Sequence, residues 1–262
     1  MTITQYYILP TALIPNSPRP LLHYTNVLPA IAKGEDGFDR VDPVAGYTLF
    51  KKNGWQVAWI YRYGATQRSH FHPEVHECMI VLSGRATIRF GAGDISDDLH
   101  QNTHGDAWEK GTLVTPVTPD DPRGSAVIPG GTPGVYVVPS GGVTLEAKAG
   151  DVFVIPAGVA HKTLNTRPAA AFQLMSPGVG LSFGDSESKM PSTLASISLS
   201  GFTMMGAYIS TEWDSAIRGG DFEASWMVPR PASDPVFGTG PEGLCGTWFG
   251  IPGSERVSML RS

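Results

Sequence analysis

Hydrophobic and polar positions alternate in short runs along most of the chain. Runs of four to seven residues that are rich in aromatic and β-branched side chains predict β-strands. They occupy 55–61, 78–82, 86–90, 135–138, 143–147, 152–155, 169–175 and 204–210. A Ser83-Gly84 turn between the second and third runs indicates a hairpin. The pattern predicts an all-β chain with little helix.

Two polar stretches interrupt this rhythm, at about 91–133 and about 178–202. Strands of the same style flank both stretches, so we interpret them as insertions within one domain. We therefore expect a single domain over 1–262, with its barrel core at about 47–90 and 134–210. An N-terminal arm and a Pro/Gly-rich C-terminal tail are expected to pack outside that barrel.

Composition supports this picture and excludes several classes of function. The chain is 41% hydrophobic and 16% charged, with 31 Gly and 22 Pro, which suits many strands joined by turns. The net charge of −5, without any large basic cluster, argues against a nucleic-acid partner and leaves a small-molecule substrate as the expected partner. No apolar run approaches the roughly 20 residues that span a membrane. The N-terminus has no signal-peptide pattern, so a cytoplasmic location is expected.

The candidate chemistry lies in two histidine-containing segments. In the first, His70 and His72 are separated by one residue, and Glu77 follows a short turn. Side chains alternate across a strand, so the two imidazoles should share a face, and Glu77 at the start of the next strand should bring a carboxylate towards them. The second segment contains Pro156 and Gly158, which shape a tight turn before His161.

The spacing of both segments matches the two signature motifs of the cupin superfamily, which the chain resembles. The first motif runs from Gly64 to Gly84, and the second runs from Gly150 to Asn165. The resemblance implies a double-stranded β-helix, also called a jelly-roll barrel. It also implies one divalent metal ion held by four ligands, namely His70, His72, Glu77 and His161.

Three neutral imidazoles and one carboxylate suit Fe, Mn, Ni, Cu, Co or Zn, and the ligand types do not select among them. His76 leaves an alternative open, because it could contact Glu77, replace Glu77 as a ligand, or join Glu77 as a catalytic residue. Strand parity further predicts a substrate pocket that contains Arg68, Met79 and Thr163.

Further segments, such as Gly206-Ala207-Tyr208 and Pro229–Gly238, resemble the YjlB-like cupins of bacteria and fungi. The insertions resemble those of cupins from fungal secondary metabolism. The family resemblance does not supply a reaction. The aromatic content of 10%, the expected apolar barrel interior and the insertions favour an enzyme that acts on a small organic metabolite, with an oxygenase as the leading expectation. A non-redox isomerase, cyclase or lyase and a non-catalytic binding cupin stay open as alternatives. A homodimer is also expected, since cupins often pair edge strands.

Overall fold

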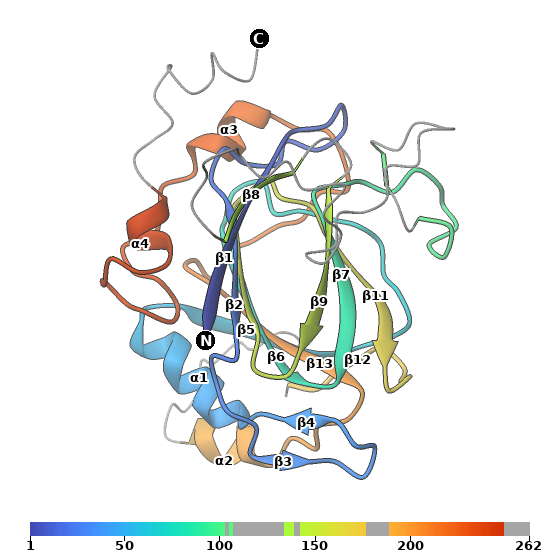
Figure 1. The fold of residues 1–262 in the computed structure, drawn as a ribbon, viewed down its shortest axis with the longest axis vertical. Coiled ribbons are helices and arrows are strands. Elements are labelled where there is room, and N and C mark those ends of the chain that lie inside the picture. Colours follow the sequence, from blue (N-terminus) through green and yellow to red (C-terminus); the bar gives the residue numbers. More distant parts are fainter. Residues whose placement is uncertain (103–104, 107–133, 139–141, 177–188, 249–262) are drawn as a thin grey trace.

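The structure is a computed structural model, and two β-sheets dominate it (Figure 1). It describes residues 1–102, 105–106, 134–138, 142–176 and 189–248. Most of the first predicted insertion, and the part of the second that precedes residue 189, lie outside the described residues. Among the described residues, no helix is both long and apolar enough to cross a membrane.

The larger sheet follows the order β12-β5-β13-β6-β10-β2-β1-β8, and β4, paired with β3, attaches to β6. Its neighbours are antiparallel except for β1 and β8. Its strands are β1 (Thr2–Ile8), β2 (Leu21–Thr25), β3 (Ala32–Lys33), β4 (Asp39–Arg40), β5 (Gln56–Tyr63), β6 (Glu77–Ser83), β8 (Val135–Val138), β10 (Val152–Ile155), β12 (Gln173–Leu174) and β13 (Phe202–Tyr208).

The smaller sheet has the order β11-β7-β9 and closes the other side of the barrel (Figure 1). Its strands are β7 (Arg85–Phe90), β9 (Val143–Lys148) and β11 (His161–Arg167). Alternate residues of both sheets fill the space between them, and this first core contains Ile88, Leu145 and Phe153. The predicted all-β jelly-roll fold is confirmed.

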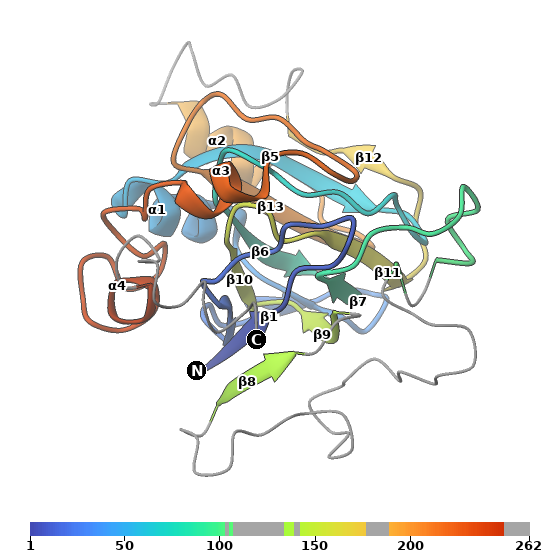
Figure 2. The ribbon, with the colours of Figure 1, turned by 90° about the horizontal axis from the view of Figure 1, so that it is seen from above.

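A second core covers the outer face of the larger sheet, where α1 (Pro43–Lys52) and α2 (Met190–Ala195) lie (Figure 2). The C-terminal segment adds Trp248 to this core, after the short helices α3 (Phe222–Met227) and α4 (Leu244–Thr247). The expected start of the barrel core near residue 47 therefore falls within a helix. The physical reason is local, since Asp42 caps the first turn by accepting a hydrogen bond from the Val44 amide, and proline occupies the first helical position.

The N-terminal segment differs from the arm that the sequence indicated. It supplies β1 and β2, which pair with each other and continue the larger sheet beyond β10. Tyr6 and Leu21 are buried in the barrel core rather than packed on its outside. The segment folds this way because Thr2–Ile8 places a buried side chain at Tyr6 and another at Ile8, the period of a strand.

Candidate metal centre

Three histidines meet at one end of the barrel, where β11 begins. His161 is the first residue of β11, and the short segment that carries His70 and His72 lies beside it. The backbone amide of His70 donates to the carbonyl of His161 at 3.2 Å, and the amide of His161 donates back at 2.8 Å. This bridge holds two sequence motifs that lie about ninety residues apart side by side.

The three imidazoles form a potential metal site. One ring nitrogen from each of His70, His72 and His161 lies within 4.8 Å of the others. The Nδ1 atoms of His70 and His161 face the backbone carbonyls of Arg68 and Val159, each at 3.3 Å, and His72 Nδ1 contacts the carbonyl of Asp214. A carbonyl can only accept, so each Nδ1 carries a hydrogen, and in the neutral form of each ring Nε2 then keeps its lone pair.

Glu77, the first residue of β6, places its carboxylate against this cluster. Its Oε2 atom lies 3.2 Å from Nε2 of His161 and 3.6 Å from Nε2 of His72. This oxygen is buried and has no hydrogen-bond donor among the residues that the structure describes. With neutral imidazoles, the Nε2 lone pairs of His72 and His161 and this oxygen therefore face one another, an arrangement that a cation stabilises. The donor set fits the expected divalent metal ion.

Burial and charge set the protonation of these groups. Burial, together with the neighbouring His161 and His72, lowers the pKa of His70 to about 3, so this imidazole is neutral at pH 7. Burial also opposes a charge on His72, but the Glu77 carboxylate outweighs that effect and raises the His72 pKa. Burial raises the pKa of Glu77, but the adjacent imidazoles of His72 and His161 outweigh burial and hold that pKa well below its usual range. Glu77 is therefore a carboxylate.

Tyr208 and Trp59 support the carboxylate from the larger sheet, and sequence reasoning missed both. Tyr208 donates its hydroxyl hydrogen to Oε1 of Glu77 at 2.6 Å, while Trp59 Nε1 donates to the Tyr208 oxygen at 3.0 Å. The register of β13 places Tyr208 directly beside Glu77. The signals in the sequence were the position of Tyr208 near the end of a predicted strand and its place in the Gly206-Ala207-Tyr208 segment.

His76 does not join the cluster. Its Nδ1 accepts a hydrogen bond from the Ala157 amide at 2.9 Å, and its Nε2 contacts the Pro229 carbonyl and Nη1 of Arg19, both at 3.2 Å. The ring also packs against Trp248. With both nitrogens engaged, His76 has no atom left to hold a metal or to move a substrate proton. The structure therefore contradicts the open alternative in which His76 replaces or assists Glu77.

The three residues predicted to line a pocket lie in different environments. Met79 is buried in the barrel core, and Thr163 is buried on the smaller sheet, opposite Ile88. Arg68 is different, because nearly half of its side chain is exposed and its guanidinium lies 3.9 Å from the exposed Asp97 carboxylate. The prediction of an inward guanidinium is therefore wrong. Residues 67–69 form no regular strand, so the alternation of side chains between the two faces of a strand does not extend from His70 back to Arg68.

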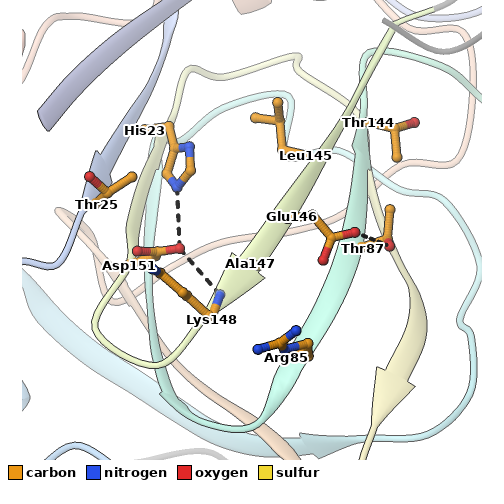
Figure 3. A pocket seen from close by; sticks show the side chains of 10 residues that line it. All are labelled: His23, Thr25, Arg85, Thr87, Thr144, Leu145, Glu146, Ala147, Lys148 and Asp151. Atoms are coloured by element: carbon orange, nitrogen blue, oxygen red, sulfur yellow. Dashed lines mark hydrogen bonds and ion pairs between the residues drawn. The ribbon is translucent and has the colours of Figure 1, made fainter. Parts of the chain in front are cut away.

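A separate cavity of about 700 Å³ lies away from the histidine cluster, at the end of the barrel where β7 begins (Figure 3). Strand β7 begins at this cavity with Arg85, and its other end, Phe90, pairs with His161 of the histidine cluster. Figure 3 shows Asp151 beside His23, with 3.5 Å between Asp151 Oδ2 and His23 Nε2. None of the predicted site residues lines this cavity.

Comparisons with known proteins assign the fold family. No curated protein matches the chain. Among solved structures, procruciferin, an 11S globulin from Brassica napus, is similar over 72% of this chain and 29% of its own, with 9% identity and a TM-score of 0.26. This chain therefore spans less than a third of that protein. The sequence model of the cupin family matches residues 47–178, which is half of the chain and contains all four predicted ligands. The chain belongs to the cupin family.

Proposed function

We propose that this cupin is a metal-dependent enzyme that acts on a small organic metabolite, with oxygenase chemistry as the leading candidate. The observation that carries the proposal is the close approach of one ring nitrogen from each of His70, His72 and His161, with Oε2 of Glu77 3.2 Å from Nε2 of His161. We assign His70, His72, Glu77 and His161 as the metal ligands. His70 is only half-buried, which leaves this side of the cluster accessible to a substrate.

The bound ion would act as a Lewis acid and, if redox-active, would let dioxygen react with a coordinated substrate. The chain's own contribution is to fix the ligands before substrate arrives. Backbone carbonyls orient the three rings, and the hydroxyl of Tyr208 holds one oxygen of Glu77. Buried Met79 and Thr163 are proposed to bound the interior of the substrate pocket.

A non-redox isomerase, cyclase or lyase is the second candidate. It is favoured by the ionised state of Glu77, which could accept a proton from a substrate carbon if it is released from the metal. A non-catalytic metal-binding cupin is the third candidate. We also propose that the chain is YjlB-like, on the segments quoted above, and that it forms a homodimer.

The first test is metal content. Purified protein should carry about one transition-metal ion per chain, measured by mass spectrometry of the elements. His70→Ala and His161→Ala should each lose most of that metal, because each variant lacks one ligand. His100→Ala is the matched control, since His100 is exposed and lies outside the cluster. Full occupancy in a double variant of His70 and His161 would contradict the assigned site.

The second test separates the candidate reactions. Protein loaded with Fe(II) or with Zn(II) is incubated with a panel of catechols, 1,3-diketones and hydroxy acids, with and without dioxygen. The oxygenase predicts oxygen consumption that matches product formation in the iron-loaded protein. Equal turnover of the zinc-loaded protein without oxygen would favour the non-redox candidate. Metal binding without turnover of any compound would favour the non-catalytic candidate.

A further inference from the structure

The segment that follows β13 carries an aromatic side chain next to the histidine cluster. The indole of Trp213 stacks on the ring of Tyr208, with 5.1 Å between ring centroids and 16° between ring planes. The same indole lies perpendicular to His72, at 5.5 Å and 86°. Trp213 therefore contacts one proposed metal ligand and the residue that holds another.

Trp213 nevertheless remains 45% exposed, so part of the indole surface beside the cluster is available for contact. Its position is fixed by two anchors close to it in sequence. Phe71 and Ala216 exchange backbone hydrogen bonds of 2.8 Å in both directions, and His72 Nδ1 contacts the carbonyl of Asp214. These contacts thus hold the partly exposed indole next to the histidine cluster.

We infer that Trp213 is a specificity-determining residue that forms an aromatic wall of the substrate site. This inference rests on the proposed metal-dependent function and narrows its substrate class. The favoured substrate is a planar aromatic compound with two adjacent oxygen atoms, such as a catechol or an ortho-hydroxy acid. Its oxygens would bind a metal held by the histidine cluster, and its ring would lie against the indole, because aromatic rings prefer offset stacked or edge-to-face contacts.

The position of Trp213 supports this class over an aliphatic metabolite. Tyr208 stacks on one side of the indole. The imidazole of His72, a proposed metal ligand, lies perpendicular to the same indole. An aliphatic chelator reaches the same metal without gaining a ring contact. The difference between the two kinds of chelator is therefore the quantity that tests the role of Trp213.

The experiment compares two bidentate ligands on full-length protein loaded with Fe(III). The probes are 4-nitrocatechol, which is aromatic, and acetohydroxamic acid, which is aliphatic, and each is titrated by its visible absorption. The variants are Trp213→Leu and Trp213→Phe, with Phe172→Leu as a control at an exposed aromatic residue that packs on Tyr61. Iron content and unfolding temperature are measured for every variant.

Trp213→Leu should weaken 4-nitrocatechol by about 3- to 10-fold, the range expected for one aromatic contact, and change acetohydroxamic acid less than twofold. Trp213→Phe should keep most of the affinity for 4-nitrocatechol, and the control should match the wild type. Equal weakening of both probes would show that Trp213 only supports His72, and no weakening of either would show that it is not part of the site. Both results overturn the inference while leaving the metal site intact. Failure of the wild-type protein to retain iron or to bind either probe would instead overturn the proposed function.

Discussion

At the scale of single residues, the two oxygens of Glu77 have different partners. Oε1 accepts the hydroxyl hydrogen of Tyr208, and Oε2 faces the imidazoles of His72 and His161. Burial and the adjacent Glu77 charge raise the pKa of Tyr208 well above its usual range, so the phenol keeps its hydrogen and acts as a donor. The carboxylate is thereby oriented to offer one oxygen to a cation.

Removing this hydroxyl should weaken metal binding without unfolding the protein. Tyr208→Phe is expected to lower metal affinity by about 10- to 100-fold, the usual effect of losing a partner of a metal ligand. Competition with a chromophoric chelator measures the affinity. Tyr61→Phe is the matched control, because Tyr61 packs on the same Trp59 ring but makes no hydroxyl hydrogen bond among the described residues. Unchanged affinity in Tyr208→Phe would remove Tyr208 from the site.

Gly206 shows how the backbone makes room for Trp59. A Cβ atom at this position would lie 2.1 Å from the indole ring, far inside contact distance. Gly206→Ala should therefore displace Trp59 and break its hydrogen bond to Tyr208, with a loss of about 1–3 kcal/mol in the free energy of unfolding. Urea unfolding, followed by tryptophan fluorescence, measures the loss. Gly64→Ala is the control for substituting a glycine, because its φ is not positive and an added Cβ atom would lie no closer than 3.5 Å to its neighbours.

At the scale of elements, the outer face of β7 and β11 is covered by the segment that follows β7. Lys162 and Arg89 lie opposite each other on these strands, and both are almost fully buried. Asp94 from that segment lies 3.1 Å from Lys162 Nζ and 3.0 Å from Arg89 Nη2. One carboxylate thus compensates two buried cations and holds the segment against the smaller sheet.

Asp94→Asn should consequently be strongly destabilising. The variant removes the carboxylate that contacts both buried cations, and breaking a buried ion pair costs on the order of 3–5 kcal/mol. Urea denaturation gives the change in the free energy of unfolding. Asp97→Asn serves as the control, because its side chain is exposed and its contact with Arg68 is long. A loss below about 1 kcal/mol in Asp94→Asn would contradict the assigned role.

At the scale of the whole molecule, the N-terminal and C-terminal segments meet beside the proposed metal site. His76 joins Arg19 of the N-terminal segment to Pro229 of the C-terminal segment, one residue away from Glu77. Trp248 packs on His76 and donates its Nε1 hydrogen to the Pro20 carbonyl at 2.9 Å. The N-terminal segment, through Arg19 and Pro20, and the C-terminal segment, through Pro229 and Trp248, thus meet at His76, next to Glu77.

Metal removal should therefore lower the stability of the whole domain. An ion that binds only the folded state adds about 3–4 kcal/mol when its concentration is 100 to 1,000 times its dissociation constant. Dialysis against EDTA should reduce the unfolding temperature, and the metal should restore it. His70→Ala should show almost no such response, because it lacks a ligand. A wild-type unfolding temperature that is indifferent to EDTA would argue against a structural contribution from the metal.

The sequence by itself determined many of the strands and the histidine spacing, but it did not predict β1, β2 or β11, and of the run at 169–175 only Gln173–Leu174 forms a strand. Alternation within a strand is a local property, so the runs at 135–138 and 152–155 match β8 and β10, and the cluster of three histidines could be anticipated from spaced motifs. Where the chain leaves regular strand geometry, local parity fails. This is why the directions of Arg68 and His76 could not be predicted.

Only the tertiary structure decided which distant side chains complete the site. Tyr208 reaches Glu77 through the pairing of β13 with β6, and Trp213 reaches His72 through a backbone bridge between segments about 145 residues apart. The N-terminal segment entered the sheet for the same reason, because its pairing partner β10 lies far along the chain. Such contacts depend on which strands become neighbours, and that choice is made by the packing of the whole barrel rather than by any local run of residues.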